Sequence, residues 1–176
     1  RERRSSLDGE RAEVLVGQRL AGLQAQDCLV LHDIPVDGFN IDHVVVGACA
    51  VYAVETKSRR KVGKGKASAN VGYDGKALTF PGWTETRPLE QAKAQARWLA
   101  DYLGGETGEP VPVIPVLCLP GWFVQVDRVA QRAEVRVINP GMTGVFFDAG
   151  SLPRLQQAQR NRIANALFKR YPDIED

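Results

Sequence analysis

Two apolar, β-branched runs separated by only four residues place the strongest constraint on the fold. Ile41–Val46 (IDHVVV) and Val51–Lys57 (VYAVETK) have the composition of strands, and the intervening Gly47–Ala50 stretch predicts a hairpin between them. In both runs, the residues at odd-numbered and at even-numbered positions, which point to opposite faces of a strand, are mostly apolar. Because neither face suits water, we expect this hairpin to be central in a sheet that is covered on both sides.

Three charged residues interrupt the apolar pattern of this hairpin, namely Asp42, Glu55 and Lys57. Strand side chains alternate, so Glu55 and Lys57 point to the same face. A two-residue turn at Ala48-Cys49 would place Asp42 directly opposite Glu55, with their Cβ atoms about 5 Å apart. Carboxylates that close repel each other unless a cation lies between them, and Mg²⁺ is commonly held by one or two carboxylates.

A structural role for these carboxylates, as turn caps or partners of an arginine, remains the alternative at this stage. The apolar surroundings favour a functional reason, because an unpaired charge within an apolar strand is costly.

The segment from about Asp8 to Ala25 predicts a helix with Asp8 as its N-cap, preceded by frayed residues 1–6. At 100° per residue, Glu13 lies on the apolar face of this helix and Glu10 lies about 60° to its flank. Glu13 is therefore predicted to reach toward the Asp42–Glu55 pair. A partly exposed glutamate near the helix start is the alternative.

The rest of the chain alternates between strand and helix signals. Residues 58–87 read as loop, with a small hairpin at Tyr73–Phe80 around Asp74-Gly75. The other predicted elements are a strand at Cys28–Ile34, a helix at Pro88–Leu103 stopped by Gly104-Gly105, a strand at Val111–Leu119, edge strands at Phe123–Val126 and Glu134–Ile138, and a helix from Ser151 to about Arg170. This order predicts an α/β layered domain with a mixed sheet.

Composition excludes several classes of protein. With 176 residues, 44% hydrophobic and 25% charged, the chain suits one globular domain rather than a disordered segment. It contains no apolar run of about 18 residues and no signal-peptide pattern. Its three cysteines sit among apolar neighbours, which disfavours disulfides or a cysteine zinc site and predicts a reducing, cytoplasmic location. Because the chain does not begin with Met, we expect it to be part of a longer protein.

A strongly basic segment directly follows the second strand of the hairpin. Six of the ten residues from 57 to 66 are basic, in a chain whose formal net charge is only +2. Such a glycine-containing loop is suited to contacting a phosphate backbone, with a solvated surface as the alternative. The predicted DNA contacts are Arg59, Arg60, Lys61, Lys64 and Lys66. The chain has no P-loop, GxSxG or HExxH motif, and its two histidines, His32 and His43, offer little to a nucleophilic triad.

Three stretches together resemble the nuclease-related domain (NERD) family, within the restriction-endonuclease-like PD-(D/E)xK superfamily. They are GERAEVLVGQRL (9–20), NIDHVVVGACAVYAVETKS (40–58) and RPLEQAKAQARWLADYL (87–103). The resemblance implies one nuclease-like domain over residues 1–176, with an α-β-β-β-α-β core at about 8–120 and C-terminal strands and a helix at about 121–170. The chain departs from the superfamily pattern at Ile41, where a proline often precedes the aspartate.

The resemblance also implies roles for individual residues. Asp42 and Glu55 would bind Mg²⁺ or Mn²⁺, with the backbone carbonyl of Thr56 as an additional ligand. Lys57 would orient the attacking water or stabilise charge on the phosphate.

Each flanking helix would contribute one further catalytic residue. Glu13 fits an E-x-x-V-G-x-x-L pattern in the first helix, with Glu10 as the alternative. Gln91 matches a glutamine of the second helix, although a polar residue on the helix flank is an equally good reading. His43 follows Asp42, so it points to the opposite face and is expected to be a packed histidine.

The function implied is that of a metal-dependent deoxyribonuclease that hydrolyses phosphodiester bonds with metal-activated water. DNA is the expected partner, and a fused or associated larger protein and a homodimer are further options. Three rivals remain at this stage: a nuclease-like module that binds nucleic acid or a protein without cutting, a regulatory appendage of a larger enzyme, and an α/β domain with purely structural carboxylates.

Overall fold

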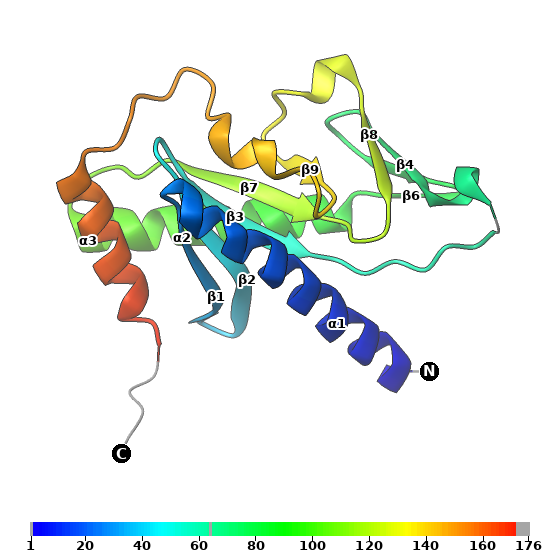
Figure 1. Cartoon of the computed structure of the whole chain (residues 1–176), viewed down its shortest axis with the longest axis horizontal. Helices are drawn as coiled ribbons and strands as arrows, with labels where there is room; N and C mark the ends of the chain where they lie inside the picture. Colours follow the sequence, from blue (N-terminus) through cyan, green and yellow to red (C-terminus); the bar gives the residue numbers. More distant parts are fainter. Residues whose placement is uncertain (1, 64, 172–176) are drawn as a thin grey trace.

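The computed structural model describes residues 2–63 and 65–171 and has a mixed five-stranded sheet at its centre (Figure 1). The strand order is β1-β2-β3-β7-β9. The strands span Leu29–Val36 (β1), Phe39–Val46 (β2), Val51–Thr56 (β3), Val113–Cys118 (β7) and Arg136–Ile138 (β9). β1, β2 and β3 are antiparallel neighbours, whereas β3, β7 and β9 run parallel. The predicted α/β class with a mixed sheet is confirmed.

A second, four-stranded sheet forms where the sequence predicts mostly loop. Its order is β6-β5-β4-β8, with bounds Trp83–Glu85 (β6), Leu78–Phe80 (β5), Asn70–Tyr73 (β4) and Phe123–Val126 (β8). The predicted small hairpin is confirmed as β4–β5, and Asp74 holds its turn by accepting hydrogen bonds from the Lys76 and Ala77 N–H groups, each at 2.8 Å. The two predicted edge strands therefore belong to different sheets, because β8 pairs with β4 and β9 pairs with β7.

Helices cover both faces of the central hairpin. α2 (Arg87–Thr107) and α3 (Gln157–Phe168) pack on one face, whereas α1 (Glu2–Ala21) and the 3₁₀ helix η4 (Thr143–Phe147) pack on the other. Every residue of β3 is buried, as expected for a strand that is covered on both sides. The remaining 3₁₀ helices are η1 (Gly22–Gln26), η2 (Lys66–Ala69) and η3 (Arg128–Ala130). Within the described ranges, no helix is both long enough and apolar enough to cross a bilayer.

The predicted ends of the first two helices are wrong. α1 already runs from Glu2, so Asp8 lies inside the helix rather than at its N-cap, and residues 2–6 are helical rather than frayed. The Arg and Glu residues of this segment favour helix. Gly104-Gly105 does not stop α2, which ends at Thr107 before Gly108. Gly108 has a φ of 74°, the left-handed conformation that commonly follows a helix.

The last helix also begins later than predicted. Ser151 does not cap it, because α3 starts at Gln157 after an irregular stretch. In that stretch the Leu155 N–H donates a 2.8 Å hydrogen bond to the Ala48 carbonyl, in the turn of the β2–β3 hairpin. This tertiary bond holds the segment in a non-helical path and fastens the C-terminal region to the central hairpin.

Candidate active site

The register of the β2–β3 hairpin places two carboxylates side by side. The Gly47 N–H donates a 2.9 Å hydrogen bond to the Ala50 carbonyl, which closes the predicted two-residue turn. The strand pairs run from Val46–Val51 to His43–Val54, so the predicted register is confirmed over these four pairs. Just beyond them, Asp42 binds the Thr56 N–H, and the charge of Glu55 raises its pKa, so the two carboxylates lie near each other.

Asp42 lies where β2 breaks the alternation of its side chains. Ile41 and Val44 lie in the same apolar cluster although they are three positions apart, so the strand changes faces around Asp42. The position opposite on β1 is Asp33, whose φ of 54° is left-handed. At this kink the Asp42 carboxylate accepts a 2.8 Å hydrogen bond from the Thr56 N–H of β3 while also lining a cleft beneath α1.

Glu55 is held from two directions at the end of β3. It is only 7% exposed, and its Oε1 lies 3.0 Å from Lys57 Nζ. Its Oε2 accepts a hydrogen bond from the side-chain amide of Gln95 on α2. Lys57 is itself fixed, because its backbone N–H donates to the Cys118 carbonyl of β7 at 3.0 Å. The sheet thus fixes the E-x-K segment beside the neighbouring strand.

Gln95 is a site residue that the sequence analysis missed. Among the described residues, Gln91 makes no hydrogen bond to the site, whereas Gln95, one helical turn later, binds Glu55. Helical geometry could have distinguished the two, since Gln95 lies about 40° nearer than Gln91 to the apolar stripe of α2. The catalytic role predicted for Gln91 stays a prediction without a contact to support it.

Replacement of Gln95 tests this assignment. We expect Gln95→Ala to lower the free energy of unfolding by about 1–2 kcal/mol, because a buried carboxylate loses a hydrogen bond. Gln91→Ala is the matched control on the same helix, and should change the stability by less than about 0.5 kcal/mol. Urea denaturation of both variants measures the difference. Equal effects would contradict a specific role for Gln95.

Glu13 contributes a third carboxylate from α1. A cleft of about 500 Å³ separates this helix from the β1–β2 hairpin, and Glu10, Glu13 and Asp42 all line it. Partial burial and then the negative charges of Asp33 and Glu55 raise the pKa of Glu13. The charge of Glu13 also raises the pKa of Asp42, whereas Glu10 is not among the groups that shift this pKa. This geometry favours Glu13 over Glu10 as the acidic residue of the site.

The surroundings of Asp42 raise the pKa of its carboxyl group. Burial, and then the charge of Glu55, raises the pKa of Asp42 to about 7, although the hydrogen bond from Thr56 opposes the rise. Around neutral pH this carboxyl group therefore holds a proton part of the time. A divalent cation would have to displace that proton in order to bind.

The donor set suits a cation that takes few protein ligands. In residues 2–63 and 65–171, no group of three or more His, Cys, Asp or Glu side chains converges closely enough to hold an ion. Asp42 and Glu55 form a pair instead, which fits Mg²⁺ or Mn²⁺ with water and substrate phosphate as the other ligands. The role of the Thr56 carbonyl as an extra ligand stays a prediction.

Two histidines, His32 and His43, also line the cleft beneath α1. His43 is 4% exposed, and its Nδ1 lies 2.9 Å from Nδ1 of His32, so the expected packed histidine is confirmed. The predicted opposite face is wrong, because His43 lines the same cleft as Asp42 where β2 breaks its alternation. Burial and then His32 lower the pKa of His43 to about 4. A Cβ at Gly17 would lie 3.4 Å from the His43 ring, so a residue without a side chain suits this point of α1. The close approach of α1 here sets the position of Glu13.

The first arginine of the basic loop has a structural partner. Arg59 Nε lies 3.1 and 2.9 Å from the two carboxylate oxygens of Glu85 on β6. The Arg59 carbonyl accepts a 3.3 Å hydrogen bond from the indole N–H of Trp122. Arg59 thus ties the loop to the second sheet. Its ion pair with Glu85 competes with the DNA contact predicted for the same guanidinium.

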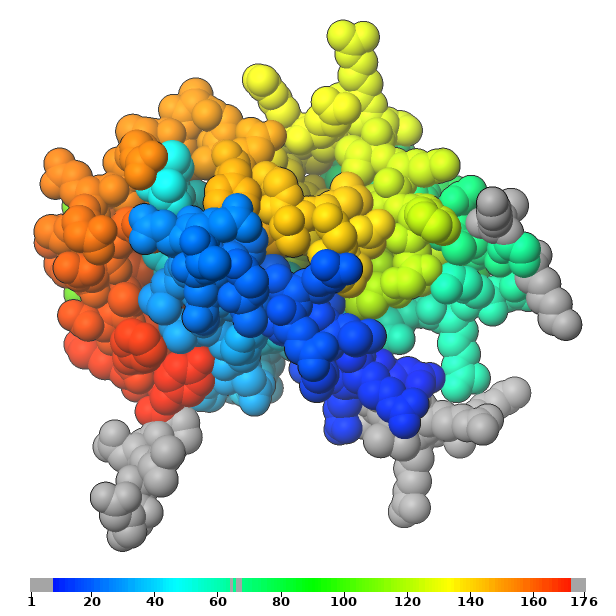
Figure 2. Space-filling view, viewed as in Figure 1, coloured from blue at the N-terminus to red at the C-terminus, as the bar shows by residue number. Residues whose placement is uncertain are grey.

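The following basic residues are more available. Arg60 has 71% of its side chain exposed, although its guanidinium lies 3.6 Å from the Asp8 carboxylate of α1. Lys61 Nζ lies 5.8 Å from the ring centre of Trp122. Of the other predicted DNA contacts, Lys64 lies outside the described residues and only the backbone of Lys66 is described. Val14 and Leu15 of α1 are more than half exposed, and the part of this helix drawn in blue in Figure 2 lies at the surface of the molecule.

Sequence comparison identifies the family to which these features belong. The profile of the nuclease-related domain (NERD) family matches residues 8–120, which include α1, the carboxylate hairpin and α2. The chain therefore belongs to the nuclease-related domain family. No curated protein matches this sequence.

A solved structure also shows similarity over part of its length. It is that of SfsA from Pyrococcus furiosus in complex with Ca²⁺, which is 16% identical in sequence with a TM-score of 0.36. The match covers 76% of this chain and 56% of the SfsA chain. This chain thus corresponds to little more than half of SfsA.

Proposed function

We propose that this protein is a metal-dependent deoxyribonuclease that hydrolyses phosphodiester bonds. The observation that carries the proposal is the convergence of Asp42, Glu55 and Lys57 at the end of β3, where Lys57 Nζ is 3.0 Å from Glu55. Membership of a nuclease-related family supports the same class of reaction. Mg²⁺ or Mn²⁺ is the proposed cofactor, and DNA is the proposed substrate.

Asp42 and Glu55 would hold the cation, which when bound lowers the pKa of water and polarises a phosphoryl oxygen. The chain's own residues prepare the site for this role. Gln95 fixes the Glu55 carboxylate, and the Thr56 N–H fixes that of Asp42. The Lys57 ammonium group would stabilise the negative charge that develops on the phosphate during attack.

The loop that follows Lys57 would contact the phosphate backbone of the substrate. Arg60 and Lys61 follow the site directly in the chain, and their charges favour a polyanion. Arg59 contributes by anchoring the loop through Glu85. Binding that depends on these side chains should weaken steeply as salt concentration rises.

A cleavage assay tests the proposal directly. Labelled circular single-stranded and duplex DNA, and their linear forms, are incubated with the protein in EDTA, Mg²⁺ or Mn²⁺. We expect cleavage with either metal ion and none in EDTA. Circular dichroism verifies that the protein is folded in each buffer. Intact DNA of every form after incubation of folded protein with both metal ions would contradict the proposal.

A module that binds DNA without cutting it is the second candidate. The observation that favours it is that each oxygen of Glu55 already has a protein partner, Lys57 for one and Gln95 for the other. Gel-shift measurements alongside the cleavage assay separate the two functions. DNA binding without cleavage in either metal ion would establish the module.

A further inference from the structure

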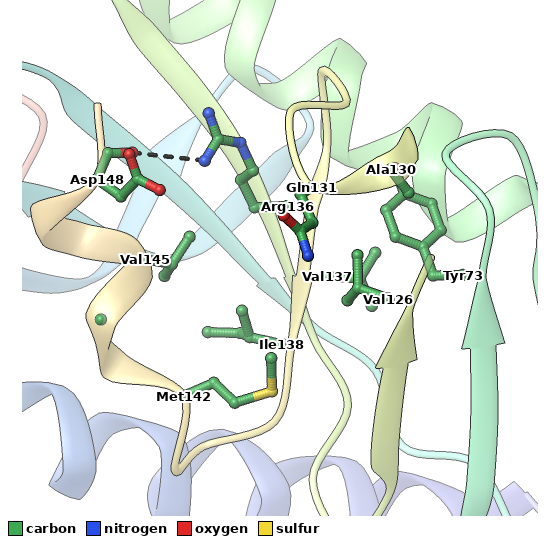
Figure 3. Close-up of a pocket in the computed structure, with 11 residues that line it drawn as sticks. Tyr73, Val126, Ala130, Gln131, Arg136, Val137, Ile138, Met142, Val145 and Asp148 are labelled. Atoms are coloured by element: carbon green, nitrogen blue, oxygen red, sulfur yellow. Dashed lines mark hydrogen bonds between the residues drawn. The ribbon is translucent and has the colours of Figure 1, made fainter. Parts of the chain in front are cut away.

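A cavity separate from the carboxylate site lies between the two sheets. It has a volume of about 440 Å³, and it opens between β9 and η4 on one side and β4 and β8 on the other (Figure 3). Its lining is largely apolar, and it includes Val126, Val137, Ile138, Met142 and Val145. Asp42, Glu55, Lys57 and Gln95 do not line it. Cavities of 300–1,000 Å³ with mostly apolar walls and a few polar groups are typical of small-molecule sites.

The main polar group of this cavity is the guanidinium of Arg136, which has few partners. Its Nη1 makes a long hydrogen bond of 3.4 Å to the Asp148 carbonyl, and its Nε is buried without a partner (Figure 3). Among the described residues, no carboxylate lies within salt-bridge distance of Arg136. Guanidinium has five donors in a fixed fork, and a buried charged donor without a partner is destabilising. Arg136 is half-buried and shares the cavity lining with Asp148, and its Nε keeps a donor that no described residue uses.

The walls around Arg136 are fixed by their own hydrogen bonds. Tyr73 donates through its hydroxyl to the Val135 carbonyl at 2.7 Å, which positions its ring beside the cavity. The Met142 N–H donates to the Asn139 carbonyl at 3.0 Å, in the turn that follows β9. The Asp148 carboxylate accepts a hydrogen bond from the Gly150 N–H, which fixes the position of the Asp148 side chain. A ligand would therefore enter a site that is already formed.

We propose that this cavity binds a small organic anion, whose carboxylate or phosphate group pairs with Arg136. Guanidinium recognises both groups through two parallel hydrogen bonds. The apolar body of the ligand would rest against Ile138 and Met142. This site is independent of the proposed nuclease activity, and its test does not involve DNA cleavage.

Met142 provides a specific reporter, because it is the only methionine in the chain. Labelling with ¹³C-methyl methionine gives one NMR signal from the cavity wall of the whole protein. The probes are benzoate, thymidine 5′-monophosphate, neutral thymidine and inorganic phosphate. We expect saturable shifts of the Met142 signal with benzoate or the monophosphate, and none with thymidine. The anion that binds with the higher affinity shows whether the site prefers carboxylate or phosphate.

Three substitutions make the test decisive. Arg136→Gln should weaken binding by roughly tenfold or more, because it removes the charge-assisted pair. Arg132→Gln removes an exposed positive charge nearby and should leave the affinity unchanged. Arg136→Lys keeps the charge without the fork, and gives an intermediate affinity even if the glutamine variant does not fold. Absence of a saturable Met142 shift with both organic anions, or equal affinity in the parent and Arg136→Lys proteins, would overturn the proposal.

Discussion

Asp42→Asn is expected to abolish metal-dependent DNA cleavage and, at the same time, to stabilise the metal-free protein at pH 8. Activity should fall by roughly 10³-fold, equivalent to about 4 kcal/mol, because the cation loses one of its two carboxylates. Stability should rise because Asn removes a charge that burial and Glu55 both disfavour. Asparagine can still accept the hydrogen bond from the Thr56 N–H, so the local geometry is preserved.

The direction of the stability change depends on pH. The Asp42 pKa rises from 3.8 to about 7 on folding, so between these values the folded chain keeps a proton that the unfolded chain releases. Stability contributed by this group is complete below about pH 4 and is lost as the pH rises through about 7. The full shift corresponds to about 4 kcal/mol, and we expect roughly half of it after solvent screening. Asp42→Asn should therefore raise the melting temperature by roughly 4–8 °C at pH 8 and by little at pH 4.

Thermal unfolding in EDTA at both pH values measures this effect. Glu10→Gln is the matched control, since Glu10 lines the same cleft without acting on Asp42. Addition of Mg²⁺ should stabilise the parent protein but not the Asp42→Asn variant, because ligand binding to the folded state shifts the unfolding equilibrium. A variant that is less stable than the parent at pH 8 would show that Asp42 is a structural carboxylate.

The local pattern of the central hairpin was sufficient to predict how it brings Asp42 and Glu55 together. Turn length sets the register of antiparallel strands, and the two-residue turn at Ala48-Cys49 gives the register seen between β2 and β3. The charges of Asp42 and Glu55 were visible because they break an otherwise apolar pattern. This part of the site depends on residues that are close in sequence.

The second sheet and the partner of Glu55 were not predictable in the same way. β5 and β6 have only three residues each, and β4 is completed by β8, about fifty positions further along the chain. Strands this short carry little periodicity, so long-range pairing decides whether they form. Gln95 likewise depends on how α2 is rotated against β3. Helical geometry places Gln95 about 40° nearer than Gln91 to the apolar stripe of α2, but the sequence of α2 alone does not show that Glu55 is the side chain it meets.

Lys57→Met should remove catalysis while leaving the substrate and the cation bound. Loss of the ammonium group removes stabilisation of the developing phosphate charge, so we expect kcat to fall by roughly 10²–10³-fold. The Michaelis constant for DNA should change little, because this stabilisation acts mainly in the transition state. Glu55 keeps its hydrogen bond from Gln95 and loses a competing cation, so Mn²⁺ should bind at least as tightly as in the parent protein.

Arg60→Met is the matched control for Lys57→Met, because it removes the same charge from the same loop. Arg60 is exposed and lies beyond the site, so its loss should raise the Michaelis constant and reduce the salt dependence of DNA binding with kcat preserved. Steady-state kinetics of both variants, with calorimetric titration of Mn²⁺, separate the two roles. If Lys57→Met raised only the Michaelis constant, Lys57 would be one more backbone contact of the basic loop. A loss of Mn²⁺ binding would instead mean that the Lys57–Glu55 ion pair holds the carboxylate in place for the metal ion.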